Sequence, residues 1–164
     1  TIQPYLQDLI YHLLKENYIV TYRPHPSNIK EKKVLILTNR FRNNKNFKLD
    51  ITSNYFNNYS SSNLMITDIS GTAYTYAFLT KNPVFFYSRN EKAIKKTYYN
   101  NLSYFKDRQK IGKVFLSTKS IIVFFKKNKN NKFKKAFKRN ILDIYKKHFD
   151  KLDYNIFKKL YDKK

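Results

Sequence analysis

The chain has 164 residues, of which 41% are hydrophobic, including 15 Tyr and 14 Phe. This length suits one domain, and the apolar content excludes a disordered chain although the mean hydropathy is −0.69. The absence of Cys excludes disulfides and cysteine nucleophiles, and no apolar run approaches the ~18 residues of a membrane span. The first residues lack the basic start and apolar core of a signal peptide, and they lack an initiator Met, which favours a fragment of a longer protein.

The charge is strongly positive. There are 34 Lys and Arg against 11 Asp and Glu, which gives a net charge of +23. A polyanionic partner would account for this excess. The coding bias of an AT-rich genome would account for it equally well, because Lys, Asn, Ile and Tyr are abundant while Gly numbers only 2. The charge is concentrated toward residues 119–164.

Helical and extended patterns alternate along the first half of the chain. Helical spacing of apolar residues from Pro4 to Asn17 predicts a helix, and the β-branched and aromatic residues 18–22 predict a strand. The run 34–37 fits a helix or a strand. Residues 47–51 alternate as in a strand near a sheet edge, and residues 53–62 predict a helix behind a Ser cap.

The second half continues the alternation. Residues 64–68 predict a buried strand, 72–79 a helix, 84–87 a strand and 112–116 a last strand, before two or three basic amphipathic helices from residue 121. Strands separated by helices imply a Rossmann-like α/β fold with a mainly parallel sheet and flanking helices. We therefore predict a single domain, with residues 1–118 as the lobe and 119–164 as helices packed on it.

The turn that follows the strand at 64–68 has the composition of an anion site. Asp68, Ser70, Gly71 and Thr72 stand between that strand and a helix, and the first amides of a helix attract anions. Gly71 would let a phosphate approach the backbone, and both hydroxyls could donate to it. An ordinary N-cap formed by Ser70 is the alternative, and the turn by itself favours that alternative.

A second unusual turn follows the strand at 18–22. Pro24 and Pro26 restrict the backbone on both sides of His25, and the guanidinium of Arg23 suits phosphate. A histidine held in this way could donate to a phosphate oxygen or take a proton from a hydroxyl, although it could also simply fill the turn. Ligands of parallel sheets bind beyond the carboxyl ends of the strands, where both turns lie.

Three blocks resemble a known family. The blocks are Tyr22-Arg23-Pro24-His25-Pro26, residues 64–72 ending in Thr67-Asp68-Ile69-Ser70-Gly71-Thr72, and Asn82-Pro83-Val84-Phe85-Phe86-Tyr87. In order and spacing they are similar to blocks in the C-terminal lobe of CDP-glycerol glycerophosphotransferases. These bacterial enzymes build teichoic acids and related capsule polymers. The chain departs from the family in its Ser-Gly-Thr turn, where Ser-Ser is usual, and in opening at the first helix of the lobe.

The resemblance implies a GT-B fold, of which this chain is the C-terminal lobe and from which the N-terminal lobe is missing. It implies that Ser70, Gly71 and Thr72, with Asp68 beside them, hold the pyrophosphate of the donor. His25 would lie beside the transferred phosphoryl group, and Arg23 would neutralise charge or brace the turn. Glu91 falls where such folds often place an acid that contacts the ribose.

We therefore expect a transferase that moves glycerophosphate, or a similar CDP-activated alditol or sugar phosphate, to a cell-surface polymer acceptor. We expect no cofactor and no metal, since no acidic pair stands at ligand spacing. One alternative is a CMP- or UDP-sugar-dependent capsule glycosyltransferase lobe. The other is a non-enzymatic basic module that binds a polyanion, although no nucleic-acid motif is present and no nucleic acid is expected as a partner.

The tail carries a dense basic segment. Phe133, Phe137 and Ile141 recur at helical spacing, which predicts a helix with a narrow apolar stripe and a broad cationic face. The expected membrane- or polyanion-binding residues are Lys126, Lys127, Lys134, Lys135, Lys138 and Arg139. Anionic lipid is the partner we expect, because an enzyme that extends a lipid-linked polymer must work at the membrane. This predicts a cytoplasmic protein that is peripheral on the inner face of a bacterial cell membrane.

Overall fold

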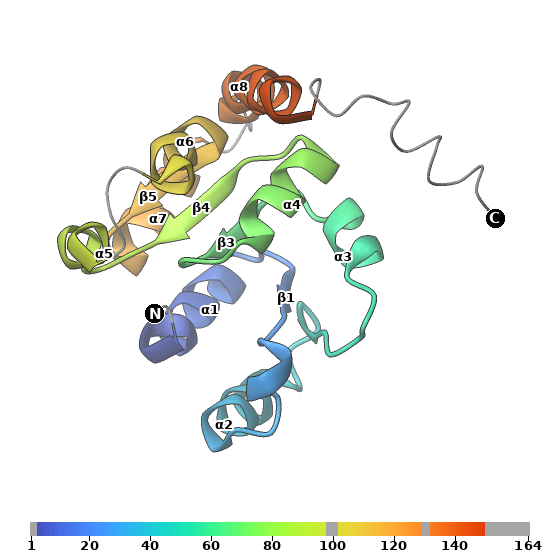
Figure 1. The fold of residues 1–164 in the computed structure, drawn as a ribbon. Helices are drawn as coiled ribbons and strands as arrows, with labels where there is room; N and C mark the ends of the chain where they lie inside the picture. Colours follow the sequence, from blue (N-terminus) through green and yellow to red (C-terminus); the bar gives the residue numbers. More distant parts are fainter. Residues whose placement is uncertain (1–2, 98–101, 129–131, 150–164) are drawn as a thin grey trace.

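The computed structural model describes residues 3–97, 102–128 and 132–149, in which helices and short parallel strands alternate (Figure 1). The first half comprises a 3₁₀ turn η1 (Gln3–Tyr5), α1 (Leu6–Lys15), β1 (Val20–Tyr22), a 3₁₀ turn η2 (Pro26–Asn28), α2 (Lys32–Phe41), β2 (Phe47–Leu49) and α3 (Phe56–Ser61). The second half comprises β3 (Met65–Thr67), α4 (Thr72–Thr80), β4 (Val84–Tyr87), α5 (Glu91–Thr97), α6 (Ser103–Ile111), β5 (Gly112–Phe115), α7 (Thr118–Lys127) and α8 (Phe133–Phe149). The predicted Rossmann-like α/β architecture is confirmed.

All strand pairs are parallel, but the hydrogen bonds divide the strands into two sheets. β1 pairs with β2, and β3, β4 and β5 form the second sheet in that order. Our expectation of one sheet is therefore wrong for the described residues. The reason is that β1 and β3 meet through side chains: Val20, Leu64 and Ile66 pack against one apolar cluster without a shared ladder.

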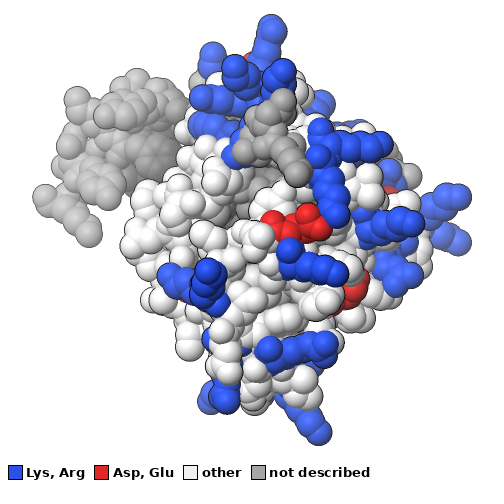
Figure 2. Space-filling model, turned by 180° about the vertical axis from the view of Figure 1, so that it is seen from behind, with Lys and Arg blue, Asp and Glu red and all other residues white. Residues whose placement is uncertain are grey.

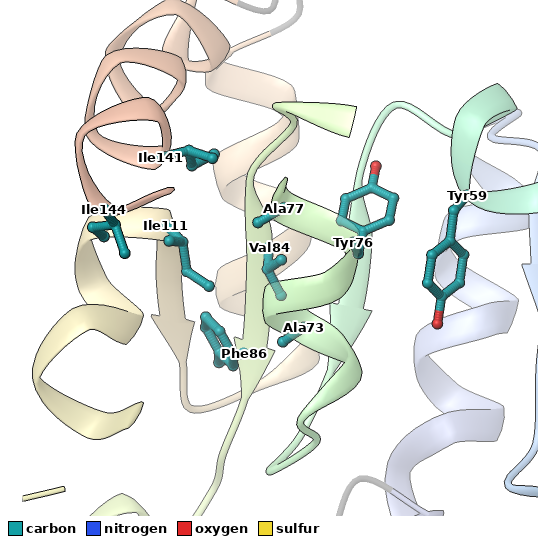
Figure 3. Close-up of a cluster of buried hydrophobic side chains, with 9 residues drawn as sticks. All are labelled: Tyr59, Ala73, Tyr76, Ala77, Val84, Phe86, Ile111, Ile141 and Ile144. Carbon is teal, nitrogen blue, oxygen red and sulfur yellow. The ribbon is translucent and has the colours of Figure 1, made fainter. Parts of the chain in front are cut away.

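β4 is the centre of the fold and is buried on both faces. Val84 and Phe86 face a cluster that α3, α4, α6 and α8 complete (Figure 3). Phe85 and Tyr87 face the opposite cluster, which α1 and α7 complete. Successive side chains of a strand point to opposite faces, so the continuous run Val-Phe-Phe-Tyr suits a strand covered by helices on both sides.

α1 joins the two sheets. Leu9 and Leu13 pack in the cluster beneath β4, whereas Ile10 and Leu14 pack with β1, β2 and α2. In Figure 1 α2 lies at one end of the molecule and α8 at the other, with β1 between them. The ambiguous run 34–37 is helical, because Val34, Leu37 and Phe41 form the face of α2 that is buried in this second cluster.

Several local predictions need correction. α3 has Tyr55 at its N-cap with no side-chain cap, so the predicted Ser cap is wrong. Asn54 provides the local contact instead, since its Oδ1 accepts a hydrogen bond from the Phe56 N–H. β3 is only half-buried, not buried. α5 and α6 occupy a segment to which we assigned no element from the sequence.

The basic tail packs on the lobe through two helices. Ile121 and Ile122 of α7 are buried beneath β4 and β5, and Ile141 and Ile144 of α8 are buried against α4 and α6. Phe133 and Phe137, from the predicted apolar stripe, also contact these clusters. Residues 150–164 of the tail lie outside the described residues. Within the described part of the chain, no helix is long and apolar enough to cross a bilayer.

Candidate functional site

Three polar turns follow the carboxyl ends of strands. Arg23 to Pro26 follows β1, Asp68 to Gly71 follows β3, and Ser88 to Asn90 follows β4. In the register of the second sheet, Thr67 pairs with Phe86, so the turns after β3 and β4 start side by side. Ligands of parallel sheets bind beyond this edge. The edge beyond β3 and β4 is therefore the candidate site.

The hydroxyl turn after β3 caps α4 with backbone groups. Gly71 is the N-cap residue, and no side chain accepts a hydrogen bond from the first amides of α4. The alternative in which Ser70 serves as the N-cap is therefore wrong. Ser70 Oγ instead lies 2.8 Å from Thr72 Oγ1, so both hydroxyls lie together at the N-terminus of a nine-residue helix. A Cβ added at Gly71 would meet no atom within 4 Å, which leaves open space in front of the backbone there.

Two tyrosines hold this turn against α6. Tyr104 donates its hydroxyl to the Ser70 carbonyl at 3.4 Å, and Tyr74 donates to the Tyr104 carbonyl at 2.7 Å. Burial raises the pKa of both phenols, so both remain hydrogen-bond donors at neutral pH. The position of the hydroxyl turn thus depends on α6, a helix that the sequence analysis did not predict.

His25 is exposed and forms the N-cap of η2. Its Nδ1 accepts from the Ser27 N–H at 3.3 Å and lies 2.6 Å from Ser27 Oγ, which also reaches Asn28 Oδ1 at 2.9 Å. In the neutral tautomer with Nδ1 as acceptor, Nε2 carries the proton and can donate. In the other neutral tautomer Nδ1–H donates to Ser27 Oγ, the Ser27 N–H loses its acceptor, and Nε2 is left to take a proton.

Arg23 is directed toward the segment that follows β2. Its Nη1 donates to Asp50 Oδ2 at 2.5 Å and its Nη2 donates to the Thr52 carbonyl at 2.7 Å. The Asp50 side chain is 1% exposed. These contacts make Arg23 a brace between the ends of β1 and β2.

Acid should release this brace. Burial raises the pKa of Asp50, but the hydrogen bonds from Thr52 and the charge of Arg23 outweigh burial and lower the pKa to about 2. A carboxylate with a depressed pKa stabilises the fold above its ordinary pKa and loses that contribution as the pH falls toward the folded value. We expect about 2 kcal/mol less unfolding free energy at pH 2 than at pH 5 from this group. Urea titrations of wild type and Asp50→Asn at both values would measure it; equal pH slopes would contradict the assignment.

Glu91 begins α5 and its side chain is mostly buried, with 15% exposed. Its Oε1 accepts from Nη2 of Arg108, and Lys95 Nζ lies 3.8 Å away. Arg108, from α6, is 1% exposed and lies over the rings of Phe86 and Phe105. The expected ribose contact is therefore coupled to an arginine that sequence reasoning missed. The spacing of Tyr104, Arg108 and Ile111 along one helical face was the available signal.

The two turns predicted to share a site lie at the ends of strands from different sheets. His25 and Arg23 follow β1, whereas Asp68, Ser70, Gly71 and Thr72 follow β3, and no hydrogen bond between these turns is found in the described part of the chain. Ser70, Tyr104, Arg108 and Glu91 are instead joined by contacts around β3 and β4. Among residues 3–97, 102–128 and 132–149, no cluster of three or more His, Asp or Glu side chains could hold a metal ion.

The cationic residues of the tail divide into two groups. Lys126 pairs with Glu16 at 2.8 Å, and Lys134 reaches Asn63 Oδ1 at 2.9 Å. Burial lowers the pKa of Lys134. The second group, Lys127, Lys135, Lys138 and Arg139, is exposed, as Lys126 is despite its ion pair. Figure 2 shows Lys and Arg over much of one face, most densely at the upper end, where α8 lies in Figure 1.

A hollow of about 250 Å³ lies away from these turns, between the end of α1 and α7. Glu16, Tyr18 and Lys126 are among its lining residues. It adjoins the residues that lead into β1, at the opposite end of the strand from His25. We therefore do not assign the donor to it.

Comparison with family models gives a match. A family model described as CDP-glycerol:poly(glycerophosphate) glycerophosphotransferase matches residues 4–162, nearly the whole chain. The match includes both turns, Glu91 and the basic helices. Searches of curated proteins and of solved structures give no match.

Proposed function

Because this chain belongs to the CDP-glycerol:poly(glycerophosphate) glycerophosphotransferase family, a family of transferases, we propose that it is the donor-binding lobe of a GT-B enzyme. The proposed donor is CDP-glycerol or a related CDP-activated alditol. The proposed acceptor is the terminal hydroxyl of a cell-surface polymer such as a teichoic acid or capsule chain. No cofactor and no metal take part in this proposal.

The observation that carries the proposal is the hydroxyl turn before α4. Two hydroxyls lie 2.8 Å apart at a helix N-terminus, and the backbone at Gly71 faces open space. Helix N-termini bind phosphate because their first amides have no partner within the helix and carry the positive end of the dipole. Ser70, Gly71 and Thr72 suit a diphosphate of the donor, and Asp68 stands at the base of the turn.

The reaction that we propose is a displacement at phosphorus. The acceptor hydroxyl oxygen forms a bond to the β-phosphorus of the donor, and the bond between that phosphorus and the oxygen bridging to CMP breaks. The electron pair leaves with CMP, and the hydroxyl proton passes to a base. His25 is our candidate for a group that takes this proton or donates to the phosphoryl oxygens. Positioning and charge stabilisation would supply most of the catalysis.

A nucleotide panel with one double variant tests the donor site. We expect the wild-type chain to bind CDP-glycerol and CDP more tightly than UDP, ADP or CMP-sialic acid by isothermal calorimetry. Ser70→Ala with Thr72→Ala should weaken CDP binding about 10- to 100-fold, the loss of one or two hydrogen bonds to a charged group. The melting temperature should change little, because neither hydroxyl caps α4.

The results also separate the competing functions. Preference for CMP-sialic acid or UDP-sugars would favour the capsule glycosyltransferase alternative. Equal, weak binding of every polyphosphate would favour the non-enzymatic polyanion module. An unfolded double variant would show that the hydroxyls hold the fold and would remove them as evidence for a donor site.

We further propose that the exposed lysines and Arg139 of the tail dock the protein on anionic lipid, on the cytoplasmic side of a bacterial membrane. Each basic residue near such a surface contributes about 1 kcal/mol of attraction. Lys127, Lys135, Lys138 and Arg139 are exposed, whereas Lys126 and Lys134 already make contacts within the lobe.

Vesicle sedimentation tests this docking. We expect binding to vesicles with 30% anionic lipid at low salt and release at high salt, since exposed charges are screened. Replacing Lys127, Lys135, Lys138 and Arg139 by Gln should abolish binding, whereas the same change at Lys32, Lys33, Arg40 and Arg42 near α2 should not. Equal loss with both sets would indicate a response to total charge.

A further inference from the structure

Unsatisfied polar atoms gather beyond the carboxyl end of β4. Four buried side-chain atoms there have no hydrogen-bond partner in the described part of the chain: Ser88 Oγ, Glu91 Oε2, and Nε and Nη1 of Arg108. Buried polar groups are almost always paired, and an unpaired one costs about 1–3 kcal/mol. Four such atoms in three neighbouring residues therefore call for a specific explanation.

Arg108 is the unusual member of this group. A guanidinium has five N–H donors and cannot lose its charge. Arg108 is 1% exposed, yet among the described residues it makes a single ion pair, from Nη2 to Glu91 Oε1, and otherwise lies over the rings of Phe86 and Phe105. Its two groups without a partner, Nε–H and Nη1–H, point in different directions, so each can donate to a separate phosphate oxygen. The described part of the fold thus provides hydrogen-bond partners for only part of the Arg108 guanidinium.

Arg108 also belongs to the surroundings of the hydroxyl turn. Tyr104 precedes it by four residues, so both side chains lie on one face of α6. Tyr104 donates to the Ser70 carbonyl, and both Tyr104 and Arg108 contact the ring of Phe86. Phe86 pairs in register with Thr67, the residue before Asp68. The buried arginine and the N-terminus of α4 therefore border the same edge of the sheet.

From this arrangement we infer that Arg108 is a further binding residue for the phosphate groups of a nucleoside diphosphate at the Ser70–Gly71–Thr72 turn. The inference rests on the proposed donor site and extends it. Arg108 Nε–H and Nη1–H donate to phosphate oxygens, Ser88 Oγ can donate to one as well, and Glu91 Oε2 accepts from a hydroxyl of the ribose. One ligand thereby satisfies all four orphaned atoms.

Access to Arg108 requires a small displacement of α5. This helix buries none of its residues, and Glu91 is its contact with α6 through Arg108. An element with so little buried apolar surface moves at low free-energy cost. A phosphate bound to Nε–H and Nη1–H would compete with Glu91 for the charge of Arg108, weaken the Glu91–Arg108 contact and open the edge of the sheet.

The test combines one variant with one measurement on the wild-type chain. Arg108→Lys keeps the charge that pairs with Glu91 but removes the two free N–H groups. We expect its affinity for CDP to fall about tenfold or more, the value of a hydrogen bond to a charged group, while the weak binding of cytidine is unchanged. Arg40→Lys is the matched control, because Arg40 is an exposed arginine of α2, outside the turns that follow β3 and β4.

Nitrogen-15 NMR of the wild-type chain covers the case in which Arg108→Lys does not fold. The Nε–H signal of Arg108, assigned through its contacts with Phe86 and Phe105, should move on addition of CDP or inorganic pyrophosphate and stay in place with cytidine. An unmoved signal while other resonances respond, or full CDP affinity in a folded Arg108→Lys, would overturn the inference.

The proposed function and this inference fail in different ways. If wild type binds pyrophosphate in an Arg108-dependent manner but shows no preference for cytidine nucleotides, the phosphate contact stands and the proposed donor is wrong. If cytidine nucleotides are preferred and Arg108→Lys binds them as wild type does, the donor stands and the role of Arg108 is wrong. Failure of wild type to bind either CDP or pyrophosphate would refute both.

Discussion

Replacement of His25 by Ala, in active enzyme that contains this lobe, should lower the rate of transfer about 100- to 10,000-fold, the usual contribution of a positioned acid–base group. CDP affinity should change only a few-fold, because the phosphates are assigned to the hydroxyl turn. The imidazole is exposed and is fixed through Nδ1 by Ser27, so its second nitrogen is free for chemistry. Steady-state rates and CDP inhibition constants, measured on the same preparation, give both quantities.

Two control variants make the His25 result specific. His25→Asn retains a side-chain acceptor for the Ser27 N–H and so preserves the cap of η2 while removing the imidazole. His12→Ala removes a half-buried histidine of α1 that contacts Asp8. We expect His25→Asn to be as inactive as His25→Ala and His12→Ala to be active. Equal losses of transfer and CDP affinity at His25 would make it a binding residue, and an active His25→Asn would limit its role to the turn.

Replacement of Gly112 by Ala should have the largest effect on the fold. Gly112 begins β5 opposite Val84, and an added Cβ would lie 1.6 Å from the Val84 carbonyl oxygen and 3.0 Å from its nitrogen. Both atoms belong to the backbone of the central strand, so no side chain can move aside. The β4–β5 ladder would have to separate at its first pair, at a cost of several kcal/mol, which is a large fraction of the stability of a small domain.

Gly71→Ala is the matched control for this prediction. The chain has two glycines, and at Gly71 a Cβ meets nothing within 4 Å, with a φ of −60° that any residue adopts. We expect Gly112→Ala to be insoluble or to lack a cooperative thermal transition, and Gly71→Ala to melt within a few degrees of wild type. Thermal unfolding followed by circular dichroism separates them. A Gly112→Ala protein as stable as wild type would contradict the close β4–β5 approach.

Local sequence patterns predicted individual helices and strands more reliably than they predicted how these elements pack together. The strand at 84–87 was predictable because four consecutive apolar residues bounded by Pro83 and Ser88 suit a strand covered on both faces. The run 34–37 was not, because four apolar residues after two lysines fit either element. Burial decides it: Val34 and Leu37 face the core, while Leu35 and Ile36 are exposed.

The site shows the same division. That Arg23 and Ser70 stand in turns after strands follows from neighbouring residues alone. The partner of Arg23 does not, since Asp50 is 27 positions away and becomes a neighbour only when β1 and β2 pair. Arg108 lies in a polar segment where a charged residue would ordinarily face water. Its burial depends on α6 packing across Phe86, and the spacing of Tyr104, Arg108 and Ile111 indicates a shared helical face without naming the strand that this face covers.

The division into two sheets also has a mechanical consequence. A sheet with continuous ladders moves as one rigid body, because sliding its strands past one another breaks hydrogen bonds. Here the β1–β2 pair, which carries His25, and the β3–β5 sheet, which carries the hydroxyl turn, meet through apolar side chains and through α1, with no shared ladder among the described strands. The β1–β2 pair can therefore slide past the β3–β5 sheet by repacking side chains, as in shear motions between packed layers. The separation between the proposed proton acceptor and the phosphate site can in this way adjust during a catalytic cycle while every strand pair stays intact.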